Sequence, residues 1–462
     1  MQAQFWLRNL PRCAGRFGIA TAILLAIGAA PAVGQEVKVE ASPPGPPGLP
    51  TGIDWVFNFK ATVGAFGFNN SLYTNPRPDE PSGDLSDNWL EGSIKGALGG
   101  TYTTASSAQI YGKLSAVGER TFSAPPPLVG GEASSFGVED AYLGWRSGNS
   151  LGDLGENALD FTVGRAPYTL GHGMLLWDGS SEGGSRGGYW TGARSAFEFA
   201  AIGRFKPGSH TLEAFYLDKD DLNENETGTR LSGANYEITG KRSTLGATYM
   251  KFFSDADVKP GRDGLNVFNV RADSAPIPKA PDLSFQFEYA AERNGDALDS
   301  NAWTLQGAYE LSAVSWKPKF SYRYASFQGD NPSTTANEAF DPLLLGFSDW
   351  GSWWQGEIAG EYFLSNSNLI SRQIRAHVTP SDKVGGGLIF YDFRLDHPEA
   401  FGPAITDDHV AFEGDLYIDW KLTRNLLMSV VAAFADPGAA VERLTGRSKN
   451  FNYGMVYLAY SY

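Results

Sequence analysis

Hydrophobic and polar residues alternate along the chain after Thr51, in runs of about 8 to 11 residues. Clusters of Gly, Asn, Asp, Ser and Pro separate the runs, a pattern that predicts antiparallel strands joined by turns and loops. The clearest run is Val314–Tyr324, which has an aromatic face and a cationic face. The apolar face carries Val314, Trp316, Phe320, Tyr322 and Tyr324, and the polar face carries Ser315, Lys317, Lys319, Ser321 and Arg323.

The same two-faced pattern returns in the runs Leu283–Tyr289, Trp303–Leu311 and Phe412–Trp420. Their length matches the roughly 9 to 11 residues that a tilted strand needs to cross a bilayer. After Thr51 no apolar stretch reaches about 18 residues, so helical membrane spanning is not predicted. Because a bilayer offers no partner to unpaired backbone groups, such strands must close on themselves. The sequence therefore predicts an all-β, antiparallel transmembrane β-barrel.

The chain ends on a strand whose alternate residues are apolar or aromatic: Val456, Leu458, Tyr460 and Tyr462. This ending resembles the terminal strand of outer-membrane barrels, which the barrel-assembly machinery recognises. We therefore expect a bacterial outer-membrane location, with lipid and lipopolysaccharide around the barrel.

The N-terminus has the pattern of a secretory signal peptide. Arg8, Arg12 and Arg16 precede an apolar run, and small residues before Gln35 indicate cleavage after Gly34. We predict a signal peptide at 1–34, a proline-rich segment at 35–52 and the barrel at 53–462. The only cysteine, Cys13, lies in the signal peptide, so the mature chain has neither disulfides nor thiolate ligands.

The mature chain is acidic. Cleavage leaves 428 residues, and because three of the 37 basic residues are removed with the leader, the formal charge moves from −15 to −18. Phosphate binding relies on Lys and Arg, so a nucleic-acid partner is not expected. An aromatic content of 13% with a mean hydropathy of −0.26 fits a protein with a narrow apolar band and a polar interior.

Three stretches resemble the alginate export porins. They are Leu159–Tyr168 (LDFTVGRAPY), Phe340–Leu369 and Val384–Leu395 (VGGGLIFYDFRL), and the likeness is strongest over Asp160–Tyr462. The resemblance implies a monomeric barrel of about 18 strands, with short periplasmic turns, long outer loops and segments folded into the lumen. In members that export alginate, it also implies an arginine-rich constriction.

Cations are expected on the inward side of several strands: Lys317, Lys319, Arg323, Arg375 with His377, and Arg204. Inward acids are equally evident: Glu288, Glu310, Glu357, Glu361, Glu413, Asp415 and Asp419. Segregation of the two signs to opposite walls would select polar or zwitterionic solutes, whereas cations gathered at the narrowest point would favour anions. The sequence leaves both arrangements open.

The glycine-rich segment Gly171–Gly188 is a candidate to enter the lumen, since glycine permits unusual backbone angles and its aromatic residues offer stacking surface. An external loop fits the same residues. Arg165 and Arg194 flank the segment and are candidates to contact an anionic solute, or else to form structural ion pairs.

Two motifs resemble chemical sites only weakly. Gly179–Gly183 has the G-x-S-x-G spacing of a nucleophile elbow, but the glycines after it favour a turn over the required helix. Asp218–Glu226 approaches a calcium loop but lacks its glycine and final glutamate, which favours a solvated outer loop over weak divalent binding that bridges to lipopolysaccharide. The five histidines form no ligand pair. Neither a metal nor a cofactor nor an enzymatic activity is expected.

These observations predict an outer-membrane porin for passive, selective passage of polar or anionic solutes, including saccharides or uronates. The alternative is an exporter of an acidic exopolysaccharide such as alginate.

Overall fold

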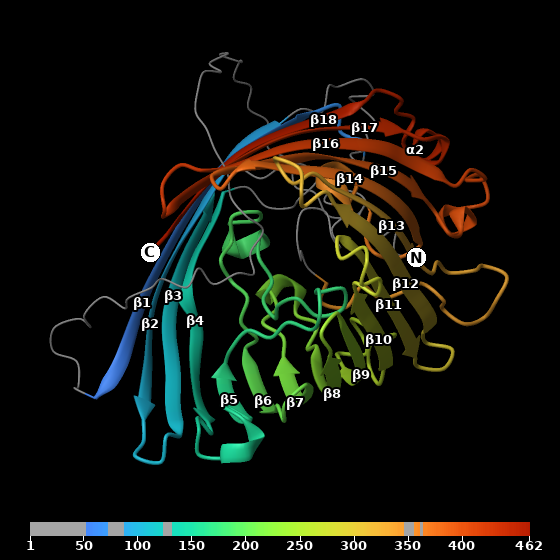
Figure 1. Cartoon of the computed structure of the whole chain (residues 1–462). Coiled ribbons are helices and arrows are strands. Elements are labelled where there is room, and N and C mark those ends of the chain that lie inside the picture. Colours follow the sequence, from blue (N-terminus) through green and yellow to red (C-terminus); the bar gives the residue numbers. More distant parts are fainter. Residues whose placement is uncertain (1–51, 73–86, 123–131, 346–354, 361–363) are drawn as a thin grey trace.

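A computed structural model describes residues 52–72, 87–122, 132–345, 355–360 and 364–462. The described strands form one antiparallel sheet of 18 strands that curves into a closed barrel (Figure 1). The strands are β1 (Ile53–Asn69), β2 (Asp87–Thr103), β3 (Gln109–Thr121), β4 (Ala133–Arg146), β5 (Leu159–Arg165), β6 (Phe199–Phe205), β7 (His210–Asp218), β8 (Arg230–Thr239), β9 (Ser243–Phe253), β10 (Asn266–Ser274), β11 (Leu283–Arg293), β12 (Asp299–Glu310), β13 (Lys319–Phe327), β14 (Leu369–Ser381), β15 (Val384–Arg394), β16 (His409–Lys421), β17 (Leu426–Pro437) and β18 (Phe451–Ser461).

The first and last strands close the barrel. Each strand pairs with its sequence neighbours, and β1 pairs with both β2 and β18. At this seam Phe59 and Tyr462 exchange backbone hydrogen bonds of 3.0 and 2.8 Å. No strand of the sheet is left with an unpaired edge, which is the condition for placing strands in a bilayer. The predicted antiparallel β-barrel is confirmed.

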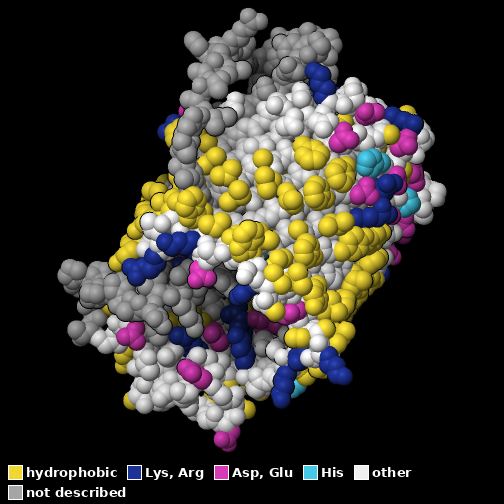
Figure 2. Space-filling model, turned by 45° about the horizontal axis from the view of Figure 1, so that its top comes forward, with side chains coloured by type: hydrophobic (Ala, Val, Ile, Leu, Met, Phe, Trp, Pro, Cys, Tyr) yellow, Lys and Arg dark blue, Asp and Glu magenta, His cyan; other side chains and the backbone are white. Residues whose placement is uncertain are grey.

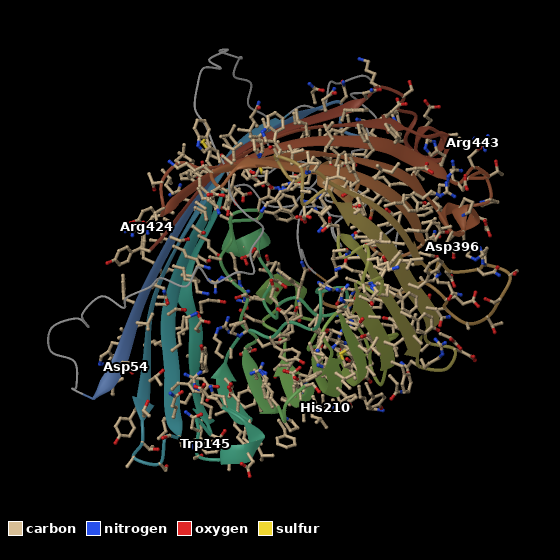
Figure 3. The ribbon with its side chains drawn as sticks, in the orientation of Figure 1. Asp54, Trp145, His210, Asp396, Arg424 and Arg443 are labelled. Atoms are coloured by element: carbon tan, nitrogen blue, oxygen red, sulfur yellow. The ribbon has the colours of Figure 1, made fainter. Side chains whose placement is uncertain are left out.

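The two ends of the barrel differ in their connections. Tight turns at 240–242, 382–383 and 422–425 lie at the end where β1 begins and β18 ends. The long connections 166–198 and 328–368, and the helix α2 (Ala439–Thr445), belong to the opposite end. Figure 3 labels Asp54, Trp145, His210 and Arg424 at the first end, and Asp396 and Arg443 at the second. In outer-membrane barrels the short turns are periplasmic, so the first end is the periplasmic one.

Apolar side chains point out of the barrel, where they form a broad band (Figure 2). Phe136, Leu143 and Ile374 are 79%, 65% and 57% exposed, although all three are large and hydrophobic. In β13 the outward Phe320 is 51% exposed and the inward Arg323 only 3%. No helix in the described ranges combines the length and apolar character needed to span a membrane.

The predicted strand at Val314–Tyr324 is too long at its start. Residues 311–318 form a periplasmic turn, and β13 begins only at Lys319. Trp316 and Lys317 have left-handed backbone angles, with φ of 72° and 39°. Pro318 has no N–H to donate to a strand ladder, and its carbonyl instead accepts a 2.8 Å bond from Leu311 that closes the turn.

Inside the barrel lies a buried apolar cluster. It joins inward residues of the walls, such as Phe252 and Phe327, to residues of the long connections, such as Leu175, Phe197 and Phe340. Burial of apolar area thus fixes the long connections inside the lumen, where a barrel of this size would otherwise hold water. The predicted signal peptide lies outside the described residues, as does all but the last residue of the proline-rich segment.

Candidate functional site: the lumen and its two inserted segments

The connection 166–198, called the first lumen segment, enters the barrel (Figure 1). Its residues Met174, Leu175 and Leu176 are fully buried. The described residues of the connection 328–368 (328–345, 355–360 and 364–368), called the second lumen segment, meet it there. Trp177 donates a 2.8 Å backbone bond to Leu344, and Leu344 donates a 3.0 Å bond to Leu175. The interpretation of Gly171–Gly188 as a lumen segment therefore holds, and the external-loop alternative does not.

Carboxylates of the wall hold the backbone of the first lumen segment. Glu91 on β2 accepts the N–H groups of Trp190 at 2.7 Å and of Thr191 at 3.2 Å. Glu119 on β3 accepts the N–H of Ala193 at 2.9 Å. Backbone outside a sheet has no ladder partner for these donors, so the carboxylates satisfy groups that burial would otherwise leave unpaired.

A β-bulge supplies the next anchor. The pairing of β3 with β4 shifts register between Leu114 and Ala116, so the consecutive acids Glu139 and Asp140 are both buried inside the barrel. Glu139 accepts the N–H groups of Ser195 at 2.6 Å and of Ala196 at 2.8 Å.

Cations balance the wall acids of β3 and β4. Asp140 lies 3.1 Å from Lys95 and 3.2 Å from Lys113. Glu139 lies 3.6 Å from Arg165 and 3.8 Å from Arg194. The anchor of the first lumen segment is thus a network of both signs, in which each buried charge has an opposite neighbour.

The second lumen segment is also held by carboxylates, from the other side of the barrel. Glu413 on β16 accepts the N–H groups of Ile358 at 2.9 Å and of Ala359 at 2.8 Å, in the single turn of π-helix η4 (Gly356–Gly360). Gly356 has φ of +83°, and a Cβ there would lie 2.2 Å from Glu413 Oε1. Only glycine permits this close approach.

The second lumen segment is also fixed at Asp341, by an ion pair. Arg262, in the connection between β9 and β10, binds Asp341 through both Nε and Nη2, and the Nε bond is 2.8 Å long. Glu292 on β11 accepts the Asp341 N–H at 2.8 Å. Burial alone would raise the pKa of Asp341, but the guanidinium of Arg262 holds it below its ordinary value.

Three acids of the lumen segments themselves have raised pKa values. Burial, reinforced by Glu139, raises the pKa of Asp178 to about 7. Burial, followed by the neighbouring Glu119 and Asp178, raises the pKa of Glu182 well above its ordinary value. Burial and then Asp415 raise the pKa of Glu357 to about 8. The protonation of Asp178 and Glu357 therefore changes across the neutral pH range.

Of the predicted site residues, Arg165 and Arg194 have structural partners. Arg194 is 8% exposed and donates to Glu119 at 2.7 Å and to Ser135 at 3.2 Å. Arg165 pairs with Asp220 as well as with Glu139. The sequence left two roles open for these residues, contact with an anionic solute or structural ion pairing, and the structure contains ion-pair partners for both residues.

The cations expected on other strands are also engaged. Arg204 on β6 donates to Glu213 at 2.7 Å. Arg375 on β14 donates to the Tyr417 hydroxyl at 2.7 Å, and His377 Nδ1 lies 2.8 Å from the same oxygen. These groups line the inner wall as part of polar networks.

The three cations expected together on one strand are separated. Arg323 is buried on the inner face of β13, Lys319 is exposed at its periplasmic end, and Lys317 lies in the preceding turn. The placement of Lys317 on the strand is therefore wrong. Its cause is the turn at Pro318, which breaks the alternation that the sequence displays.

Most of the predicted inward acids lie inside the barrel. Glu288, Glu413 and Asp415 are buried, and Asp419 accepts a 2.9 Å bond from Ser429. Glu310 lies at the periplasmic end of β12. Glu357 belongs to η4 and not to a strand, and Glu361 lies outside the described residues.

The weak motifs have ordinary structural roles. Ser181, at the centre of the elbow-like motif, accepts a 2.7 Å bond from Lys219. The single 3-10 turn η2 (Gly184–Arg186) follows the motif in place of the α-helix that an elbow requires. Asp220 and Asp221 of the calcium-like run are only 13% and 6% exposed, so the solvated-loop interpretation is wrong for them. Asp220 pairs with Arg165 and Arg186.

Within the described ranges no group of three or more His, Cys, Asp or Glu side chains is arranged to hold a metal ion.

A cavity in the inner wall was missed by the sequence reasoning. It has a volume of about 440 Å³ and lies on β7–β10 beneath the start of the first lumen segment. Arg271 on β10 is one of its lining residues. The alternation of β10, with Phe268 and Val270 outward and Asn269 and Arg271 inward, indicates from the sequence that Arg271 faces the lumen.

Comparisons with known proteins agree with this architecture. A model of the alginate export family matches residues 193–454. The structure resembles OccAB2 of Acinetobacter baumannii, with a TM-score of 0.54 and 14% identity over 88% of this chain and 98% of that one. It resembles OccK8 (OprE) of Pseudomonas aeruginosa, with a TM-score of 0.53 and 10% identity over 88% and 98%. No curated protein matches the chain in sequence.

The closed 18-strand sheet, its apolar outer band and these likenesses define a porin-like β-barrel of the bacterial outer membrane. Such folds and families are those of channels and not of enzymes. Because the family model matches more than half of its residues, the chain belongs to the alginate export family.

Proposed function

We propose that the protein is a pore for passive, selective passage of polar or anionic solutes, including saccharides and uronates. The observation that carries the proposal is a polar inner wall of mixed charge, narrowed by two segments that the wall itself holds in place. Mixed charge selects by the distribution of charge on a solute, because each sign of the wall attracts one part of it and repels another.

Exposed cations at the periplasmic mouth support entry of anions. Lys319 lies at the first turn of β13, and Lys206 follows the end of β6. Both side chains are exposed. Inward cations at a pore mouth raise the local concentration of anionic solutes.

The alternative function is export of an acidic exopolysaccharide, and the family match favours it. The pairing of Arg165, Arg194 and Arg204 with acids argues against it, because a polyanion needs a series of cations whose charge is not already neutralised. We therefore place the export of a polymer second.

As partners we propose lipid and lipopolysaccharide around the apolar band, and the barrel-assembly machinery at β18. Val456 and Tyr460 on its outward face are 41% and 38% exposed, as a lipid-facing strand requires. We further propose that the barrel acts as a monomer.

Single-channel recording in planar bilayers tests the proposal. The purified protein should give a steady, ohmic conductance with anion preference, and glucuronate should block it in a concentration-dependent manner. A polymer exporter should instead bind oligouronates far better than the monomer. Absence of any conductance, from protein whose barrel is intact by circular dichroism, would contradict the pore.

A further inference from the structure

The cavity on the inner wall is a candidate binding site for a solute on its way through the barrel. Its volume of about 440 Å³ is within the roughly 300–1,000 Å³ of small-molecule sites. Its charged lining consists of Lys206, Glu213, Glu237, Arg271 and Asp273, with His172 from the first lumen segment. No large apolar or aromatic side chain lines it, so its ligand is polar.

Several of these charges are used by the protein itself. Arg271 donates to Thr248 at 2.8 Å and Asn235 at 2.6 Å, and also to Glu237. Its guanidinium packs against Gly246 of β9, where a Cβ would lie 2.8 Å from Arg271 Cζ. Arg271 therefore shapes the cavity floor and offers little to a ligand.

Two acids of the lining are also engaged. Glu213 accepts from Arg204 at 2.7 Å through Oε1 and from Asn235 at 2.8 Å through Oε2. Both carboxylate oxygens of Asp273 lie 3.0 Å from His172 Nε2. This contact ties the cavity to the first lumen segment.

Two groups of opposite charge are left for a ligand. Within the described ranges the ammonium of Lys206 has no hydrogen-bond partner, and Glu237 uses only Oε1, toward Arg271. Thr211, which also lines the cavity, is the register partner of Glu237 and contributes a hydroxyl. A lining with one available cation and one available carboxylate oxygen disfavours a pure anion and a pure cation alike.

We propose that this cavity binds a small zwitterion, with the ligand carboxylate on Lys206 and the ligand ammonium on Glu237. A role of the cavity in transport rests on the proposed pore function, but binding of a zwitterion to the cavity does not depend on that function. The two can therefore be tested separately.

The test uses three probes of equal chain length and the full-length barrel in detergent. Titration calorimetry compares 4-aminobutanoate, which carries both charges, with butanoate and butan-1-amine, which carry one each. The zwitterion should bind about tenfold more tightly than either, since each of the others lacks one charge-assisted contact. Equal or tighter binding of butanoate or of the amine would overturn the proposal.

Variants locate the binding. Lys206→Gln and Glu237→Gln should each weaken 4-aminobutanoate binding at least about fivefold. The matched controls are Lys279→Gln, in the exposed periplasmic turn after β10, and Glu310→Gln, at the periplasmic end of β12, and both should leave binding unchanged. If the controls weaken binding as much as the cavity variants, the site is not this cavity. Conductance without zwitterion binding would contradict this inference and support the pore function. Zwitterion binding without conductance would support this inference and contradict the pore function.

Discussion

The two lumen segments are held by the same kind of bond but in different electrostatic surroundings. In both, wall carboxylates accept backbone N–H groups of the inserted chain. Around the first segment, Lys95, Lys113 and Arg165 neutralise the acids of β4. Around the second, Glu413 and Asp415 form no ion pair with the described residues, and Glu357 lies beside Asp415. The first anchor is balanced, whereas the anchor of the second segment at η4 is a cluster of carboxyl groups.

The inward acids have a different role in the structure from the one that the sequence indicates. Acids such as Glu413 look from the sequence like one wall of a transverse field for solutes. In the structure they hold the inserted backbone, and what remains for the solute is the smaller set of groups at the mouth and in the cavity. Counting every inward charged residue therefore overestimates the electric field that acts on a solute in the lumen.

The largest effect is expected from removing the balanced anchor. Combined replacement of Glu91, Glu119 and Glu139 by Ala deletes bonds to five backbone N–H groups, each worth about 1.5–3 kcal/mol because the acceptor is charged. The first segment should leave the wall, and single-channel conductance should rise severalfold. Glu132→Ala, an exposed acid of the outer loop, is the control and should conduct like the wild type. A triple variant with wild-type conductance would show that these acids do not hold the segment.

A smaller rise in conductance is expected from the second anchor. Glu413→Ala removes the acceptor of Ile358 and Ala359, whereas Glu413→Gln keeps one carbonyl oxygen for them. In single-channel recordings the conductance of Glu413→Ala should exceed that of Glu413→Gln, which in turn should exceed that of the wild type. Equal conductance of the wild type and both variants would show that Glu413 does not hold η4 in place.

Raising the pH should loosen the lumen segments. The pKa of Asp178 is raised from 3.8 to about 7 and that of Glu357 from 4.5 to about 8, so each stabilises the folded state while protonated. That stability is fully present below the ordinary pKa and is lost as the pH rises through the raised one. Conductance should therefore increase as the pH rises from about 4 to about 8.

Two variants separate the contributions to this pH profile. Asp178→Asn should remove the part of the increase in conductance that ends near pH 7, and Glu357→Gln the part that ends near pH 8. A profile that neither variant alters would assign the pH response to other groups.

The smallest effect is expected at the mouth. Lys319→Glu should lower the anion-to-cation permeability ratio about twofold, because the side chain is exposed at the start of β13. Lys317→Glu, in the turn, should change the ratio less. Reversal potentials in a salt gradient measure both, and a larger change from Lys317 would place it nearer to the permeation path than the structure does.

The fold could be predicted because its signal is local. Alternation with a period of two separates outward Phe320 and Tyr322 from inward Arg323 without knowledge of any distant residue. The exceptions are also local in origin, since Pro318 ends the alternation of its run and the bulge of β4 opposite Ser115 brings both Glu139 and Asp140 inside.

The site could be predicted only in part because its contacts are distant in sequence. Parity indicates that Glu119 points inward, but its partner Arg194 lies 75 residues away in an inserted segment. The sequence therefore located Arg165, Arg194 and Arg204 near the lumen and left their partners open. The alternation of β10 indicates that Arg271 points inward, but its partners Asn235 and Glu237 lie 36 and 34 residues away on β8, so the cavity that they form is not visible in the sequence.

Hydrogen–deuterium exchange of the first lumen segment tests most directly whether wall carboxylates hold it. In the wild-type barrel the amides of Trp190, Thr191, Ala193, Ser195 and Ala196 should exchange as slowly as those of the neighbouring strands. In the variant without Glu91, Glu119 and Glu139 they should exchange rapidly while the strands stay protected. Unchanged slow exchange at these five amides in a folded triple variant would contradict the anchoring role of the wall carboxylates.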